Sequence, residues 1–281
     1  MSLAGRGRLV LEPGMTETLL RGWTSWLKSA GRPGTTIGLR TYHVSRAARE
    51  LQIPMLEVTT TNLTDWLGAQ LWAPNTRRSY RASLVQFYRW CQASGFRPDN
   101  PAELLPLISV PRGLPRPAPD EIWRAALEAA DTRARMAMLL AGQCGLRRGE
   151  ISRLHTNDLE HDLLGYSLRV TGKGGHVRLV PLPDEDRALE FLLRRADAGW
   201  LFPSTGSGHL TAEHVGRMVS RALPDGWTCH TLRHRFATTV YRHTRDIRVT
   251  QELLGHARPE TTAIYTQLGI GDLRAAVNHA V

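Results

Sequence analysis

The sequence predicts a mainly helical α+β protein with a small β-hairpin or sheet, built from two domains. Three observations lead to this prediction. Apolar residues recur at helical spacing in the N-terminal part, a proline-rich stretch interrupts the chain, and an alternating strand pattern with a glycine-rich turn follows. We therefore expect a helical domain over residues 1–108, a linker over 109–119 and a second domain over 120–281.

The first two helices are expected to form a pair. One repeats apolar residues over Leu19–Leu27 and stops at Gly31, a residue that commonly ends helices. The other covers Thr35–Leu51 and ends before Pro54, because the residue before a proline disfavours helical geometry.

Two further helices complete the predicted N-terminal domain. The third is short, contains Leu63–Leu67 and has Thr60 or Asn62 as its expected cap. The fourth lies in "APNTRRSYRASLVQFYRWCQASG" and closes at Gly95. Its arginines suit either a solvated face or a surface that contacts DNA. The candidate DNA contacts among them are Arg77, Arg78 and Arg81.

The linker and the second domain follow from residues 109 onward. Four prolines between Pro111 and Pro119 favour an extended connection, and Asp120 suits the first turn of a new helix. Helices are predicted over Asp120–Ala130 and Thr132–Gln143. The stretch "YSLRVTGKGGHVRLVPL" alternates as two strands around a turn at Gly172–Gly175, and further helices are expected from residue 211 onward.

Composition favours a nucleic-acid partner. Lys and Arg total 36 against 26 for Asp and Glu, a formal charge of +10, and lysine is rare. Arginine forks match phosphate oxygens, although a genome rich in G and C would also raise the arginine content. Three separated cysteines, no secretory leader and no long apolar run predict a cytoplasmic protein away from membranes.

The stretch "CHTLRHRFATT" concentrates positive potential on one helical face. His230, Arg233 and His234 stand at i, i+3 and i+4, so they share that face if the segment is helical. Like charges repel, so an anionic ligand would complete the arrangement. We expect the site to be poorly ordered or strained while that ligand is absent.

Other motifs add single residues of the same chemistry. Arg147 follows Gly145, Lys173 stands at the predicted hairpin tip, and Glu150 is spaced to orient a neighbour by hydrogen bonding; "LLGHARPETTAIYTQL" adds His256 and Tyr265. The glycines around Lys173 do not make a Walker loop, and His230–His234 lacks the glutamate of a zinc-protease helix. We expect no metal site and no cofactor.

The order and spacing of these motifs resemble the tyrosine recombinase (phage integrase) family. The chain has an arginine, a hairpin lysine, H-x-x-R, G-H and a tyrosine nine residues after that histidine. The resemblance covers nearly the whole chain and implies a core-binding domain followed by a catalytic domain. It implies that the catalytic residues are Arg147, Lys173, His230, Arg233, His256 and Tyr265.

The resemblance also implies a reaction. Tyr265 would attack a DNA phosphate and form a 3′-phosphotyrosine, which a second strand reverses without metal or ATP. Arg147 and Arg233 would neutralise the phosphate charge that builds up in the transition state. His230 would accept the tyrosine proton, and Lys173 would protonate the departing 5′ oxygen.

The implied partners are double-stranded DNA and other copies of this chain. Family members act as homotetramers on two DNA sites, in some cases with a directionality factor. The segment "GDLRAAVNHAV" resembles the terminal helix that docks into a neighbouring protomer, or it packs on its own domain. The short N-terminal stretch predicts no additional arm-binding domain. Integration of a phage or mobile element is the favoured role, ahead of chromosome-dimer and transposon resolution.

Two other functions remain open. A type IB topoisomerase uses similar chemistry on one duplex as a monomer. A repressor that kept the fold would bind DNA without cutting it, although an intact Tyr265 with both arginines disfavours this reading.

Overall fold

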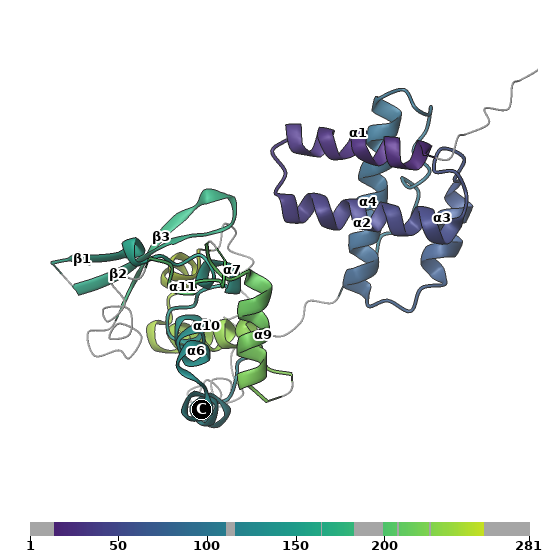
Figure 1. The fold of residues 1–281 in the computed structure, drawn as a ribbon. Helices are drawn as coiled ribbons and strands as arrows, with labels where there is room; N and C mark the ends of the chain where they lie inside the picture. Colours follow the sequence, from purple (N-terminus) through teal and green to yellow (C-terminus); the bar gives the residue numbers. More distant parts are fainter. Residues whose placement is uncertain are drawn as a thin grey trace, which may run out of the picture. The chain divides into compact units, whose positions relative to one another are not determined.

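The chain divides into two compact units, Met1–Arg112 and Gly113–Val281. A computed structural model describes residues 14–110, 116–163, 165–182, 199–206, 208–224 and 226–255. The division falls inside the stretch where the sequence places the linker. The fold class is confirmed, because helices dominate both units and one small sheet lies in the second (Figure 1).

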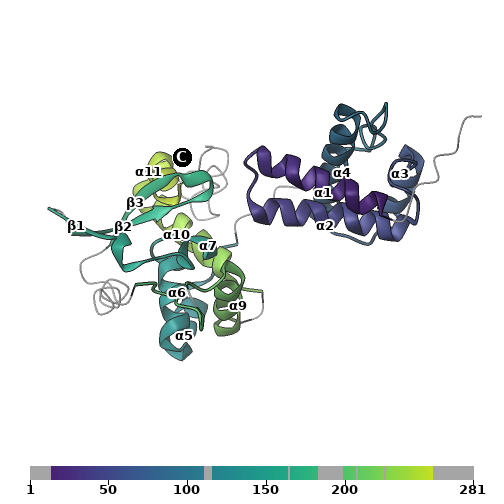
Figure 2. The ribbon, with the colours of Figure 1, turned by 45° about the horizontal axis from the view of Figure 1, so that its top comes forward.

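The N-terminal unit contains four helices around an aromatic core. They are α1 (Met15–Ser29), α2 (Gly34–Leu51), α3 (Thr60–Gly68) and α4 (Pro74–Ala93). Helices α1 and α2 lie side by side, and α4 packs across α2 (Figures 1 and 2). The core includes Trp23, whose ring meets Phe87 edge-on with 5.3 Å between centroids. The four helical patterns of the sequence are thus confirmed.

The cap of α3 differs from the predicted one. Thr59 precedes the helix, and its Oγ1 accepts a hydrogen bond from the Asn62 backbone N–H at 3.2 Å. The Asn62 side chain in turn accepts from the Thr59 N–H at 3.0 Å. Three threonines in succession made the position ambiguous in sequence, and this reciprocal pair decides it.

The second unit is organised around a helix that is buried on nearly all faces. Helix α6 (Thr132–Gly142) packs against α10 (Cys229–Thr244), α9 (Ala212–Ala222) and the short α7 (Arg148–Ile151). Eight of its residues are buried, as expected for an apolar helix at the centre of a core. Helices α5 (Asp120–Ala129) and α11 (Ile247–Leu254) complete the described helices of this unit.

A three-stranded antiparallel sheet forms one edge of the second unit. Strand β2 (Gly165–Thr171) pairs with β1 (Leu159–Asp162) on one side and with β3 (Val177–Pro181) on the other. The β2–β3 hairpin confirms the predicted strand pair, and a 3₁₀ turn over Lys173–Gly175 connects it. β1 was not predicted, because "LEHD" is short and polar. In both views β3 runs beside α11 (Figures 1 and 2).

Close helix packing at Gly142 yields a stability prediction. A Cβ at this position would lie 2.6 Å from Cη2 of Trp123, so we expect Gly142→Ala to lower the free energy of unfolding by roughly 1–3 kcal/mol. Gly38 in α2 is the matched control, because a Cβ there meets nothing within 4 Å. Gly38→Ala should raise stability by up to about 1 kcal/mol. Urea unfolding followed by tryptophan fluorescence measures both, and equal effects would contradict the packing argument.

Candidate active site

The buried carboxylate of Glu150 holds Arg147. Glu150 Oε1 accepts a hydrogen bond from Arg147 Nη1 at 2.7 Å, and Oε2 accepts from the Arg147 backbone N–H at 2.9 Å. The Glu150 side chain is 2% exposed, whereas that of Arg147 is 37% exposed. Glu150 therefore binds Arg147 at its backbone N–H and at one guanidinium nitrogen, while part of the Arg147 side chain stays exposed. The orienting contact predicted for Glu150 is present.

Arg233 is held beneath the surface by backbone oxygens. Its Nη1 donates to the carbonyl of Gly145, and its Nη2 donates to the carbonyl of Leu254 at 2.6 Å. Nη1 also lies 3.9 Å from Glu150 Oε2. Internal oxygens bind both Nη atoms of Arg233, which counts against the expectation of a poorly ordered or strained site at this residue. Arg233 is 2% exposed.

The C-terminal end of α11 supplies part of this anionic surrounding. Arg147 Nη1 lies 3.4 Å from the Leu254 carbonyl that also accepts from Arg233. The last carbonyls of a helix lack intrahelical partners and carry the negative end of its dipole. Gly255 ends α11 in the left-handed region with φ of 62°, a conformation that disfavours most other residues.

A further arginine, missed from the sequence, joins the same carboxylate. Arg178 on β3 donates to both Glu150 oxygens, at 3.2 Å to Oε1 and 2.9 Å to Oε2. Its Nε donates to the Leu253 carbonyl at 2.8 Å. In sequence Arg178 is one charged residue of the alternating stretch "YSLRVTGKGGHVRLVPL", and no motif marks it. We call Arg147, Arg178 and Arg233 around Glu150 the guanidinium cluster.

The guanidinium cluster keeps Glu150 ionised. Burial alone would raise the pKa of the carboxyl, but hydrogen bonds and charge from Arg178, with hydrogen bonds from Arg147, lower it to about 2. Three guanidiniums against one carboxylate leave two positive charges in excess. The cluster therefore offers net positive potential for an anion.

His230 and His234 lie on one face of α10, as the i, i+4 spacing predicts. Their ring centroids are 4.3 Å apart in an edge-on arrangement. Loss of water around the ring lowers the pKa of His230, and Arg233, Arg147 and Arg148 lower it further. Burial, His230 and Arg233 lower the pKa of His234 to about 4. Both imidazoles are therefore neutral at pH 7, and His230 is exposed and able to accept a proton.

The structure describes the other predicted catalytic residues, Lys173, His256 and Tyr265, only in part or not at all. Lys173 begins the 3₁₀ turn of the β2–β3 hairpin, as predicted, but its side chain lies outside the described part. His256 and Tyr265 fall within residues 256–281, which the structure does not describe. In sequence, His256 directly follows Gly255, the residue that ends α11 beside the guanidinium cluster.

Two other kinds of chemistry find no support among the described residues. Cys229, next to His230, is 4% exposed, and burial raises the pKa of its thiol to about 12. It is therefore a poor candidate for a thiolate nucleophile. Across the described ranges, no three His, Cys, Asp or Glu residues form a group able to hold a metal ion. None of the described helices is long and apolar enough to cross a membrane.

Two of the three arginines proposed to contact DNA in the N-terminal unit support its own backbone. Arg77 Nη2 donates to the Gln70 carbonyl at 2.6 Å, and Arg81 Nε donates to the Leu105 carbonyl at 3.0 Å. Arg78 is exposed. A DNA-contacting role for the three remains a prediction, and Arg78 is the member that faces solvent.

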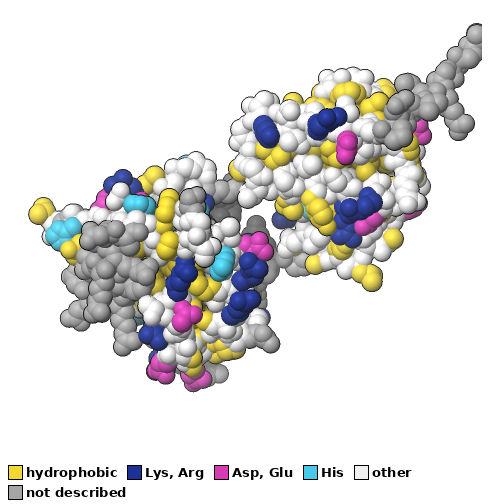
Figure 3. Space-filling view, viewed as in Figure 1, with side chains coloured by type: hydrophobic (Ala, Val, Ile, Leu, Met, Phe, Trp, Pro, Cys, Tyr) yellow, Lys and Arg dark blue, Asp and Glu magenta, His cyan; other side chains and the backbone are white. Residues whose placement is uncertain are grey.

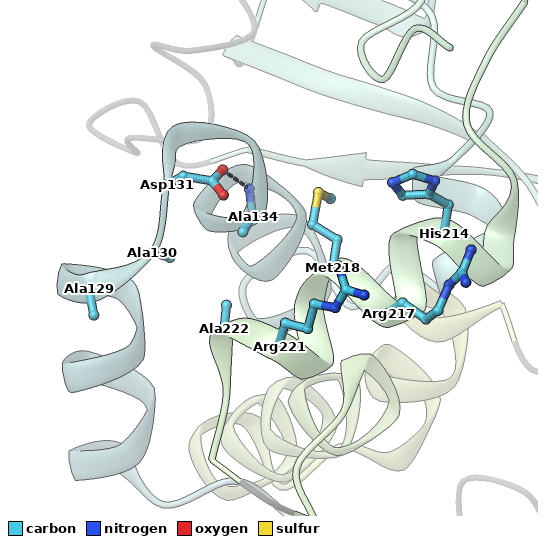
Figure 4. A pocket seen from close by; sticks show the side chains of 9 residues that line it. All are labelled: Ala129, Ala130, Asp131, Ala134, His214, Arg217, Met218, Arg221 and Ala222. Carbon is cyan, nitrogen blue, oxygen red and sulfur yellow. Dashed lines mark hydrogen bonds between the residues drawn. The ribbon is translucent and has the colours of Figure 1, made fainter. Parts of the chain in front are cut away.

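A pocket in the second unit is lined by none of the residues of the guanidinium cluster. This cavity of about 560 Å³ is lined by α9 and by the corner between α5 and α6 (Figure 4). Arg and His side chains gather over α9 in the space-filling view (Figure 3), and His214, Arg217 and Arg221 line the pocket. Its carboxylate, Asp131, caps α6 by accepting from the Ala134 N–H at 2.9 Å. The pocket contains none of the predicted catalytic residues.

Sequence comparison gives a family match. The model of the phage integrase family matches residues 119–269. Tyrosine recombinase XerD of Caulobacter vibrioides is 36% identical over 249 residues, which cover 80% of this chain and 81% of the relative. Tyrosine recombinase XerC of Erythrobacter litoralis is 35% identical over 228 residues, 73% of this chain and 72% of the relative.

Solved structures of similar fold agree with this match. A lambda integrase dimer bound to a COC′ core site aligns with a TM-score of 0.70 and 21% identity, covering 89% of this chain and 76% of that one. The XerH recombinase bound to its difH substrate aligns with a TM-score of 0.66 and 21% identity, covering 92% and 82%. At these identities the likeness concerns the fold.

The pKa of Glu150 predicts how acid affects stability. Because the folded pKa, about 2, lies below the ordinary value of 4.5, the ionised carboxylate stabilises the fold above pH 4.5, and this contribution is lost as pH falls toward 2. Its size is on the order of 3 kcal/mol. Glu150→Gln is the control, because its amide does not ionise and its stability therefore lacks this dependence on pH. Urea unfolding at pH 6, 4, 3 and 2.5 should show the gap between the two proteins narrowing, and a constant gap would contradict the assignment.

Proposed function

The chain belongs to the phage integrase family of tyrosine recombinases, and from that premise we propose that it cuts and rejoins DNA at specific sites through a 3′-phosphotyrosine intermediate. The observation that supports this most is that Arg233 meets Arg147 and Glu150, which lie more than 80 residues earlier in the chain. The guanidinium cluster has the excess positive charge that a phosphodiester requires.

The proposed cleavage step is a displacement at phosphorus. The Tyr265 oxygen forms a bond to the scissile phosphorus, and the bond from phosphorus to the 5′ oxygen breaks. The tyrosine proton passes to His230, and Lys173 gives a proton to the departing oxygen. Because the phosphotyrosine retains the energy of the broken bond, a 5′ hydroxyl of a second strand can reverse the step. The reaction as written needs no metal and no ATP.

The arginines have distinct positions in this scheme. Arg147 is the accessible one and would contact a non-bridging oxygen directly. Arg233 lies deeper and would supply the second positive charge that neutralises the phosphate. His256 would donate a further hydrogen bond to the phosphate. Planar guanidiniums suit these roles better than ammonium groups, because two donors fix two oxygen positions.

The proposal extends to partners and biological role. The partner is double-stranded DNA, because the chain has an excess of basic residues and DNA is bound in the XerH and lambda integrase structures of similar fold. A homotetramer on two DNA sites would perform the exchange, with a directionality factor in some reactions. Integration or excision of a phage or mobile element is the proposed role. Attachment repeats in the DNA that flanks the gene would support it.

Covalent capture tests the proposed chemistry. A nicked suicide duplex releases a short fragment after cleavage and so traps the protein–DNA adduct. We expect the wild-type protein to form this adduct in EDTA without ATP and Tyr265→Phe to form none, because the variant lacks the attacking oxygen. Denaturing gels measure the adduct. Binding without adduct at any site would favour a non-catalytic DNA-binding protein, and relaxation of one supercoiled circle without two-site exchange would favour a topoisomerase.

The lowered pKa of His230 predicts the pH dependence of cleavage. A general base works in its neutral form, which exists above its pKa, and that pKa lies below the ordinary 6.5. The single-turnover rate of adduct formation should therefore stay level from pH 8 to 6.5 and fall in more acidic buffer. His230→Gln should be slow and lose this dependence. His243→Gln is the control, since His243 is exposed near the other end of α10 and should leave the profile unchanged.

A further inference from the structure

Arg178 is bound more extensively than a strand residue needs to be. Its Nη1 and Nη2 donate hydrogen bonds to Glu150, and its Nε donates to the Leu253 carbonyl at the end of α11. The side chain is 10% exposed although it belongs to a hairpin whose neighbouring positions are open. A buried arginine with a bidentate carboxylate partner costs much desolvation, so its place beside Arg147 needs a physical reason.

The surroundings of Arg178 restrict it to one position. A Cβ on Gly255 would lie 2.9 Å from Arg178 Cδ and 3.1 Å from Nη1. A Cβ on Gly172 would lie 3.4 Å from Glu150 Oε1 and 3.8 Å from Arg178 Nη1. The guanidinium thus lies between Gly172, at the base of the Lys173 hairpin, and Gly255, at the end of α11.

Charge balance supplies the reason. Glu150 is needed to orient Arg147, but a carboxylate 2.7 Å from a guanidinium also cancels its charge. The phosphodiester carries one negative charge, and attack by a phenolate brings a second into the transition state. If Arg147, Arg233 and Glu150 stood alone, their net charge would be +1. Arg178 raises the net charge of the guanidinium cluster to +2, the value that matches the transition state.

We propose that Arg178 is a positioning residue of the recombination reaction, which neutralises Glu150 so that Arg147 is oriented without losing its charge. This inference rests on the proposed function, because it presupposes a phosphate beside Arg147. Arg178 itself does not touch the phosphate. Its effect passes through the carboxylate it shares with Arg147.

A double-variant comparison tests the proposal. Arg178→Met keeps length and apolar stem but removes the charge, so Glu150 would neutralise Arg147. We expect the single-turnover rate of adduct formation at saturating protein to fall at least about tenfold, with DNA affinity changed much less. Adding Glu150→Gln restores the net charge of +2. The Arg178→Met/Glu150→Gln protein should therefore cleave faster than Arg178→Met alone, although it carries one more substitution.

A matched control separates the role of Arg178 from general effects on the hairpin. Arg169 lies on β2 and pairs with Glu160, but its side chain is 51% exposed. Arg169→Met should leave the cleavage rate within about twofold, because exposed ion pairs contribute little. Thermal unfolding of every variant shows whether a slowly cleaving variant is still folded.

The outcomes distinguish this proposal from the one it rests on. No adduct with the wild-type protein on any site would overturn the proposed function and this proposal with it. An active wild type with an unimpaired Arg178→Met would overturn the role of Arg178 alone. A slow Arg178→Met that is not accelerated by Glu150→Gln would show that Arg178 acts by packing, and this too would overturn the charge-balance role.

Discussion

The second unit depends on one buried carboxylate, Glu150, and the arginines that surround it. Arg147 and Arg178 both bind it, and Arg233 approaches its Oε2. Burying an arginine without an anionic partner would be costly, and Arg178 and Arg233 are both largely buried beside the partly exposed Arg147. Glu150 and the carbonyls of Leu253 and Leu254 together make that burial possible. The cationic site can therefore be ordered before any phosphate arrives.

The hydrogen bonds of the guanidinium cluster link the candidate site to the surrounding helices and strand. Glu150 lies on α7, Arg178 on β3 and Arg233 on α10, and the accepting carbonyls end α11. Hydrogen bonds within the guanidinium cluster therefore connect all four elements. Electrostatic preorganisation of this kind reduces the rearrangement needed when charge develops at phosphorus. Arg233 is the least exposed of the three arginines.

The sequence predicted those features that depend on local patterns. Apolar periodicity located the helices of both units, and the glycines around Lys173 located the hairpin. Family resemblance brought Arg147, His230 and Arg233 into one proposed site. Arg178 escaped notice because a charged residue between Val177 and Leu179 reads as solvent-facing in sequence. In the structure it lies on the same face of β3 as the buried Val180 and binds Glu150 and the end of α11. Strand β1 escaped because its four residues are mostly polar.

The arginines of the N-terminal unit show why residue type alone does not locate a DNA surface. Arg77 and Arg81 stand on a basic helix and matched the pattern of phosphate contacts. Yet each donates to a backbone carbonyl outside its own helix, at Gln70 and Leu105, and so stabilises the segments that flank α4. An arginine has five N–H donors, so such a contact does not prevent a second one to phosphate. It does hold the guanidinium in a fixed position, and any DNA contact by these two residues must be compatible with that position.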